Sequence, residues 1–163
     1  MDTRCDGYYY IYTIGCVYPN LVELDLVDAE NITSVTKTES FVEAFAKFRF
    51  LRSLHISGNF DLGVESHYIP PRLVNIFNNC LIDFRVEHNN KINNKFFDIL
   101  ATFAFNLQSV RIEDCSNVTV HCLFFLTRCR KLTFVHVPRS FSDHTHFEAY
   151  RIRFRNDCYF SLH

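Results

Sequence analysis

The sequence predicts an α/β repeat fold in which short parallel strands form one layer and helices form the other. The first indication is an apolar pattern, Leu-x-x-Leu-x-Leu, that recurs five times at intervals of 25 to 30 residues. The second is that all fifteen of its core positions are apolar, although only 48% of the chain is hydrophobic. The third is that residues with helical spacing lie between the matches. One strand and one helix cannot bury their own apolar face, so such units stack and share a continuous core.

Each match continues for three positions beyond the pattern and ends on a small residue, an asparagine or a cysteine. The five matches are Leu21-Leu24-Leu26-Ala29, Leu51-Leu54-Ile56-Asn59, Leu81-Phe84-Val86-Asn89, Leu107-Val110-Ile112-Cys115 and Leu132-Val135-Val137-Ser140. Apolar residues alternate through their middle positions, which is typical of strands. A weaker sixth match, Ala149-Ile152-Phe154-Asp157, predicts a sixth strand.

Helices are expected between the strands because large apolar residues there recur three or four positions apart. These stripes are Phe41, Phe45 and Phe48; Leu73, Ile76 and Phe77; Phe96 or Phe97 with Leu100 and Phe103; and Leu123 with Leu126. The chain holds 18 Phe and no Trp. Rings packed between the helices and the sheet account for this surplus.

The fourth unit resembles the cysteine-containing leucine-rich repeat. Cys115 and Cys129 fall on the two cysteine positions of that repeat, and Val118-Thr119 matches its Ile-Thr pair, whereas Val120 replaces the usual Asp at the helix start. The resemblance implies a solenoid, or horseshoe, of about five to six repeats, with a parallel strand ladder on its concave face and helices on its convex face. Residues 1–163 then form a single domain, with a capping segment at 1–20, repeats at 21–140 and an irregular cap at 141–163.

This repeat subtype is characteristic of the F-box and leucine-rich-repeat substrate receptors of ubiquitin ligases. The resemblance therefore implies a non-catalytic protein-recognition module, the substrate-binding part of such a receptor. Residues 1–20 show no F-box-like segment, so a cullin-ligase adaptor would be bound through another segment. The alternative is a structural assembly factor similar to mitochondrial coupling factor B. The first 20 residues contain one Arg, two Asp and no Lys, which disfavours the Arg-rich leader that this alternative needs.

Composition excludes several other classes. With 17 Lys plus Arg against 18 Asp plus Glu, the chain is not a strongly basic nucleic-acid binder. No apolar run reaches the length of a membrane span, so we expect neither nucleic-acid nor membrane partners. Seven cysteines, an odd number without a Cys-x-x-Cys pair, indicate reduced thiols and an intracellular, cytoplasmic location.

No catalytic, cofactor or metal signature is visible. Glycine-rich phosphate loops, a Gly-x-Ser-x-Gly elbow and paired catalytic carboxylates are missing from the sequence, so we expect no enzyme and no cofactor. Cys115 and Cys129 are interpreted as structural, because zinc would need two more ligands than the neighbouring Cys122 and Cys129 supply. His144 and His146 are expected in a solvated loop.

The predicted binding surface consists of the residues between the inward-facing apolar positions. In a parallel ladder these residues form columns on the concave face. The predicted contact residues are His55, Arg85, Arg111, Phe134, His136, Arg151 and Arg153. The columns change from acidic in the first unit to basic in the last, which favours a protein partner and fits an acidic one.

Two interpretations of the arginines remain open. Glu87 and Glu113 are as well placed to neutralise Arg85 and Arg111 as a partner is. Arg151, Arg153 and Arg155 alternate along the predicted sixth strand, so they would repel one another without an anionic partner, and binding is favoured there. Phe134 and Tyr150 are the candidate aromatic anchors.

Overall fold

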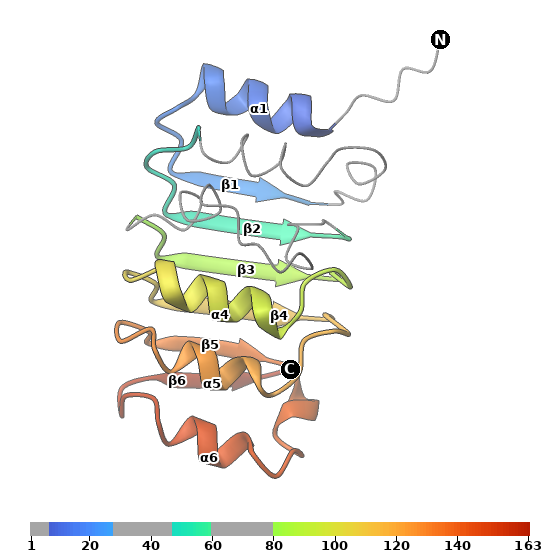
Figure 1. The fold of residues 1–163 in the computed structure, drawn as a ribbon, viewed down its shortest axis with the longest axis vertical. Helices are drawn as coiled ribbons and strands as arrows, with labels where there is room; N and C mark the ends of the chain where they lie inside the picture. Colours follow the sequence, from blue (N-terminus) through green and yellow to red (C-terminus); the bar gives the residue numbers. More distant parts are fainter. Residues whose placement is uncertain (1–6, 28–46, 60–79) are drawn as a thin grey trace.

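The computed structural model describes residues 7–27, 47–59 and 80–163, with side chains described from residue 11 onward. Six parallel strands form one sheet in chain order (Figure 1). The strands are β1 (Glu23–Leu26), β2 (Ser53–Ser57), β3 (Asp83–Glu87), β4 (Ser109–Glu113), β5 (Phe134–Val137) and β6 (Tyr159–Leu162). The predicted strands of all five regular units are therefore confirmed.

From β3 onward, helices alternate with the strands. Figure 1 shows that the described helices lie beyond β1 at one end of the sheet, against its second half, and at its other end. They are α1 (Gly7–Val17), α4 (Asn94–Phe103), α5 (Cys122–Leu126) and α6 (Phe147–Arg151), and a short 3₁₀ helix, η2, covers Arg139–Phe141. The helices expected around Phe41–Phe48 and Leu73–Phe77 lie outside the described residues, except for Phe48, which is buried.

The strand register aligns equivalent positions of the repeated pattern. The fourth position forms one continuous row: Leu24, Leu54, Phe84, Val110, Val135 and, in β6, Phe160. The first five of these side chains are at most 8% exposed. Because side chains alternate along a strand, the residues between the buried rows emerge together on the opposite side of the sheet.

The buried side of the sheet carries the aromatic core. Phe84 of β3 packs against Phe96 of α4 with ring centres 5.3 Å apart, and Phe96 meets Phe97 edge to face at 5.4 Å. All three side chains are fully buried. The predicted location of the phenylalanine rings, between helix and sheet, is confirmed for these residues, and burying each ring contributes about 2–3 kcal/mol.

The turns that follow the strands repeat as well. Gly58, His88 and Asp114, which occupy the same position after β2, β3 and β4, all have positive φ, at 92°, 50° and 47°. The amides of Gly58 and His88 each donate to the carbonyl at the end of the next strand, at 3.0 and 3.1 Å. The next residue is Asn89 in one unit and Cys115 in another, and both side chains bond the backbone of the turn.

The first residues of α4 and α5 differ in whether a side chain caps the helix. The Asn93 side chain accepts a hydrogen bond from the Lys95 amide at 2.9 Å and caps α4, which runs for 10 residues. At the start of α5 no side chain caps the helix, and α5 has five residues. The replacement of the usual Asp by Val120 predicts this weaker start, because an apolar side chain accepts no amide hydrogen bond.

The predicted sixth strand at Ala149–Asp157 is wrong. Phe147 and Phe154 are buried whereas Ile152 is 74% exposed, so the segment has helical rather than alternating spacing, and it forms α6 and the turn after it. The sixth strand is Tyr159–Leu162. No helix in the described parts of the chain combines the length and apolar character that crossing a bilayer requires.

We expect Asn89→Ala to lower the free energy of unfolding by about 2–4 kcal/mol, because the fully buried Asn89 side chain accepts the Lys91 and Ile92 amides at 2.8 and 2.9 Å. Urea denaturation measures this loss. Asn156→Ala is the control, since Asn156 is exposed and its loss should change stability by less than about 0.5 kcal/mol. Equal stability of the two variants would contradict a structural role for the Asn89 turn.

Candidate functional site

The side of the sheet opposite the aromatic core is rich in polar and titratable groups, and we call it the polar face. It is formed by Glu23, Asp25, Ser53, His55, Asp83, Arg85, Glu87, Ser109, Arg111, Glu113, Phe134, His136, Tyr159, Ser161 and the adjoining His163. Its central column reads Asp25, His55, Arg85, Arg111, His136 and Ser161. The predicted column is thus confirmed through β5, and Ser161 replaces the predicted Arg153.

Titratable side chains in the first half of the polar face lie close to one another. His55 Nδ1 lies 2.7 Å from Asp25 Oδ1, and His55 Nε2 lies 3.5 Å from Glu87 Oε2. Arg85 forms an ion pair with Glu87 and also lies 3.6 Å from Glu113 Oε1. Of the two interpretations of Arg85, the geometry favours neutralisation by its neighbours over a free binding cation.

Arg111 differs from Arg85. Its side chain is exposed, and no carboxylate of the described residues lies within ion-pair distance of its guanidinium. The guanidinium carbon instead lies 5.0 Å from the centre of the Phe134 ring. A cation over an aromatic face is held in place yet keeps its outward N–H groups available to an anion.

Rings form the second half of the polar face. Phe134 stacks on Tyr159 of the next strand with ring centres 5.9 Å apart, and its ring is nearly parallel to that of His136 at 6.5 Å. His136 stacks on His163 at 4.6 Å. Tyr159 is 65% exposed. This end of the face therefore offers flat ring surface next to the Arg111 charge.

His136 also lies beside a carboxylate, with its Nε2 3.6 Å from Glu113 Oε1. Burial lowers the pKa of His136 below its usual value, and the neighbouring His163 lowers it further. Glu113 acts in the opposite direction, while Arg111 and Arg85 again lower the pKa. These effects together favour the neutral form of the His136 ring.

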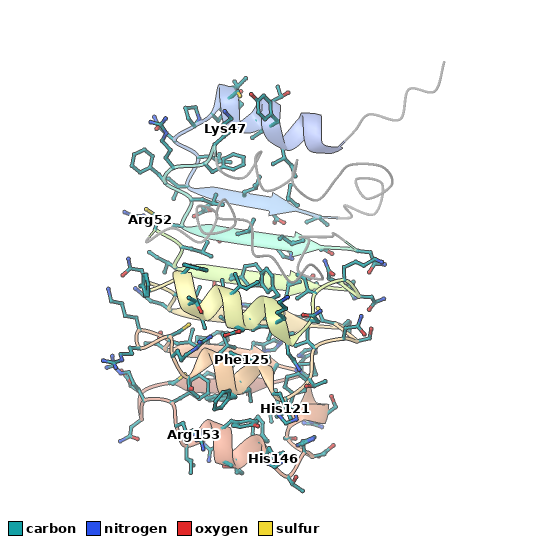
Figure 2. The ribbon with its side chains drawn as sticks, viewed as in Figure 1. Lys47, Arg52, His121, Phe125, His146 and Arg153 are labelled. Carbon is teal, nitrogen blue, oxygen red and sulfur yellow. The ribbon has the colours of Figure 1, made fainter. Side chains whose placement is uncertain are left out.

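The prediction that Arg151 and Arg153 belong to this face is wrong. Arg151 lies at the end of α6 and pairs with Glu148 at 2.8 Å. Arg153 lies 5.8 Å from the ring centre of Phe124 in α5, and Figure 2 shows it beside the helices at the end of the chain that carries α6. Arg155 pairs with Asp157 at 2.9 Å. Because the three follow a helix and a turn, they do not repel one another on one strand face, and the predicted basic end of the columns is replaced by rings.

Tyr150, predicted as an anchor, also lies on the helical side. Its hydroxyl is 2.8 Å from His121 Nδ1. His144 and His146 are exposed, as predicted, and both pack against His121, with ring centres 5.6 and 5.7 Å apart. Figure 2 shows His121 and His146 close together next to α6. These histidines form a second cluster, separate from the pair on the polar face.

Tyr159 and His163 were missed as members of the polar face. The signal that finds them is the repeat interval. Adding the last regular interval of 25 residues to Leu132 places the fourth and sixth core positions at Phe160 and Leu162. The first core position then falls on Asp157. Because this residue is polar, the segment does not match the apolar pattern.

The described cysteines are all free thiols. Burial raises the pKa of Cys115 to about 11 and that of Cys129 to about 12, and it also raises the pKa of the fully buried Cys122. Cys16 is exposed. The structural interpretation of the repeat cysteines therefore agrees with their environment, because a protonated, buried thiol is a poor nucleophile and a poor metal ligand.

Comparison with known proteins assigns no family. A scan against models of protein families finds no match, and a search of curated proteins finds no sequence of significant similarity.

We expect iodoacetamide at neutral pH to alkylate Cys16 in the native protein and to leave Cys115, Cys122 and Cys129 unmodified, because these three are buried with raised pKa values. Mass spectrometry of proteolytic peptides measures each site. In guanidinium chloride all four should react. Native-state labelling of Cys115 or Cys129 as fast as Cys16 would contradict their structural role.

Proposed function

We propose that this chain is a non-catalytic protein-recognition module of the leucine-rich-repeat type, which binds its partner through the polar face. The support from the fold is that equivalent positions of consecutive units lie in register along six parallel strands. Recurrent turns with positive φ and buried residues at the asparagine or cysteine position also favour a solenoid of stacked repeats.

The proposed partner presents a carboxylate beside an apolar or aromatic side chain. Arg111 carries this proposal, because it is the arginine of the polar face whose charge no described carboxylate neutralises. Phe134 and Tyr159 lie next to it and offer ring surface for the apolar side chain. Aromatic residues and arginine are the residue types that contribute most to protein interfaces.

The two ends of the polar face differ in charge, and this difference would orient a bound partner segment. Glu23 and Asp25 at the β1 end are acidic and exposed, whereas the β4–β6 end combines Arg111 with rings. A partner segment with an acidic residue at one end and a basic residue at the other therefore binds in one orientation across the strands. Reversing the segment would place like charges together.

The more specific form of the proposal is the substrate-binding part of a ubiquitin-ligase receptor. Its support is the cysteine-containing repeat of the fourth unit, in which Cys115 closes the turn after β4 and Cys129 packs into the core. Co-purification of a cullin adaptor with the chain tests this form. Recovery of subunits of a membrane-embedded assembly instead would favour the assembly-factor alternative.

Photocrosslinking identifies the partner directly. We expect a benzophenone amino acid in place of Tyr159 to crosslink one partner from cell extract, because that side chain is 65% exposed on the polar face. The same group in place of Phe105, which is 63% exposed in the loop after α4, is the matched control. Identical products from the two positions would contradict docking on the polar face.

We expect Arg111→Glu to weaken the affinity for that partner at least about tenfold, since a charge-assisted contact is worth about 1.5–3 kcal/mol. Isothermal titration calorimetry measures this change. Arg153→Glu is the matched control, because Arg153 also lies over a phenylalanine ring but on the helical side. Equal affinities of Arg111→Glu and the wild type would contradict the proposal that the partner binds through the polar face.

A further inference from the structure

Three potential metal ligands converge at the β4–β6 end of the polar face. They are Glu113 of β4, His136 of β5 and His163, which directly follows β6. One ligand atom from each lies within 4.8 Å of the other two, and His136 Nε2 lies 3.6 Å from Glu113 Oε1. In a tetrahedral zinc site, metal–ligand bonds of about 2.0–2.2 Å place neighbouring ligand atoms roughly 3.3–3.5 Å apart. The three groups are therefore close to coordination distance.

The strand register brings this triangle together. Arg111 pairs with His136, and His136 pairs with Ser161, so Glu113 and His163 each lie two residues beyond the level of His136 on the two neighbouring strands. At their level Pro138 directly follows the end of β5. The Glu113 and His163 side chains thus reach toward His136 from both sides.

The backbone holds the third ligand in place. The His163 amide donates to the Val137 carbonyl at 3.3 Å, and the His163 carbonyl accepts the Arg139 amide at 2.7 Å. Both hydrogen bonds tie His163 to the segment that follows His136. A ligand anchored on both sides loses little conformational entropy when it coordinates an ion.

The carboxylate of Glu113 is available. It lies 3.6 Å from both His136 Nε2 and Arg85 Nη2, which is beyond hydrogen-bond distance, whereas Arg85 already pairs with Glu87. No described group forms a hydrogen bond with this carboxylate within 3.5 Å, although the side chain is only 26% exposed. A half-buried carboxylate whose neighbours stay beyond hydrogen-bond distance keeps its oxygens open to a cation.

From this geometry we propose that Glu113, His136 and His163 bind a divalent transition-metal ion of the zinc type. Two imidazoles and one carboxylate form a known three-ligand zinc set that leaves the fourth coordination position open. Imidazole selects zinc, cobalt and nickel over magnesium and calcium, which prefer sites made of oxygen ligands. The rings of His136 and His163 stack at 12° to each other, so binding turns one ring until both nitrogens point at the ion.

The site does not depend on the proposed partner and is tested without it. Zn²⁺ is titrated into the purified chain by calorimetry under reducing conditions, and Co²⁺ is titrated in parallel with detection of its visible absorption. We expect one equivalent of either ion to bind, and we expect the Co²⁺ spectrum to lack a thiolate charge-transfer band. Bound ion also raises the melting temperature, because the unfolded chain does not hold the ligands together.

The variants assign the ligands. We expect Glu113→Gln and His163→Ala each to weaken Zn²⁺ binding by more than about tenfold, because each removes one of three ligands. The double variant His144→Ala/His146→Ala is the control, since it removes two exposed histidines from the separate cluster at His121. Melting curves in a metal chelator verify that every variant is folded.

Each outcome decides the proposal. Loss of binding in Glu113→Gln and His163→Ala with retention in the His144/His146 variant supports it. Failure of the wild type to bind Zn²⁺, a thiolate band in the Co²⁺ spectrum, retention in His163→Ala, or loss only in the His144/His146 variant overturns it. Because none of these measurements uses a protein partner, failure here leaves the docking proposal for the polar face intact.

Discussion

The parallel register of the six strands is the constraint on which the rest of the structure depends. The Arg52 and Ser53 amides share the Val22 carbonyl, and the Ile82 and Asp83 amides share the Arg52 carbonyl in the next unit. These bonds join backbone atoms only, so the backbone alone aligns each unit with its neighbour. A shift by one residue would move every apolar row to solvent and every polar row into the core. The buried row from Leu24 to Val135 makes such a shift prohibitively costly.

The same register has an electrostatic consequence. Side chains at equivalent positions lie one strand apart, so like charges would accumulate if each unit carried the same residue. The first three units avoid this by placing Asp25, His55 and Arg85 in one column, with Glu87 beside the last two. Asp25 and Arg85 thus each have a close polar neighbour in this part of the polar face, and the ion pair of Arg85 with Glu87 cancels locally. The charge at Arg111 is not cancelled in this way.

The stacked rings and the proposed metal ligands lie where the regularity of the units ends. After β5 the chain enters η2 instead of the positive-φ turn that follows β2, β3 and β4. After Pro138 and η2 the chain forms α6. It then forms β6, which pairs with β5 and places Tyr159 and His163 next to it. The stacked rings and the three metal ligands all depend on this return. His136 and His163 belong to the polar face, whereas His121, His144 and His146 pack together next to α6.

Much of the fold is determined locally and is therefore readable from the sequence. The five regular strands, α4 and α5 follow from apolar spacing, because period two and period three to four are properties of the chain itself. The columns Asp25–His55–Arg85–Arg111–His136 follow from the same spacing plus parallel pairing. The structural role of Cys115 follows from its position at the end of a repeat.

Other features were decided only by the tertiary structure. Ala149, Ile152 and Phe154 fit a weak strand pattern. Burial of Phe147 and Phe154 against the last unit instead favours a helix and turn, which removes Arg151 and Arg153 from the polar face. Arg85 has Glu87 on its own strand and Glu113 on the next strand as possible partners, and only the side-chain positions in the folded sheet decide that it pairs with Glu87. The convergence of Glu113, His136 and His163, which are 23 and 27 residues apart, requires three strands to meet, because no local pattern encodes a distance between residues so far apart in the chain.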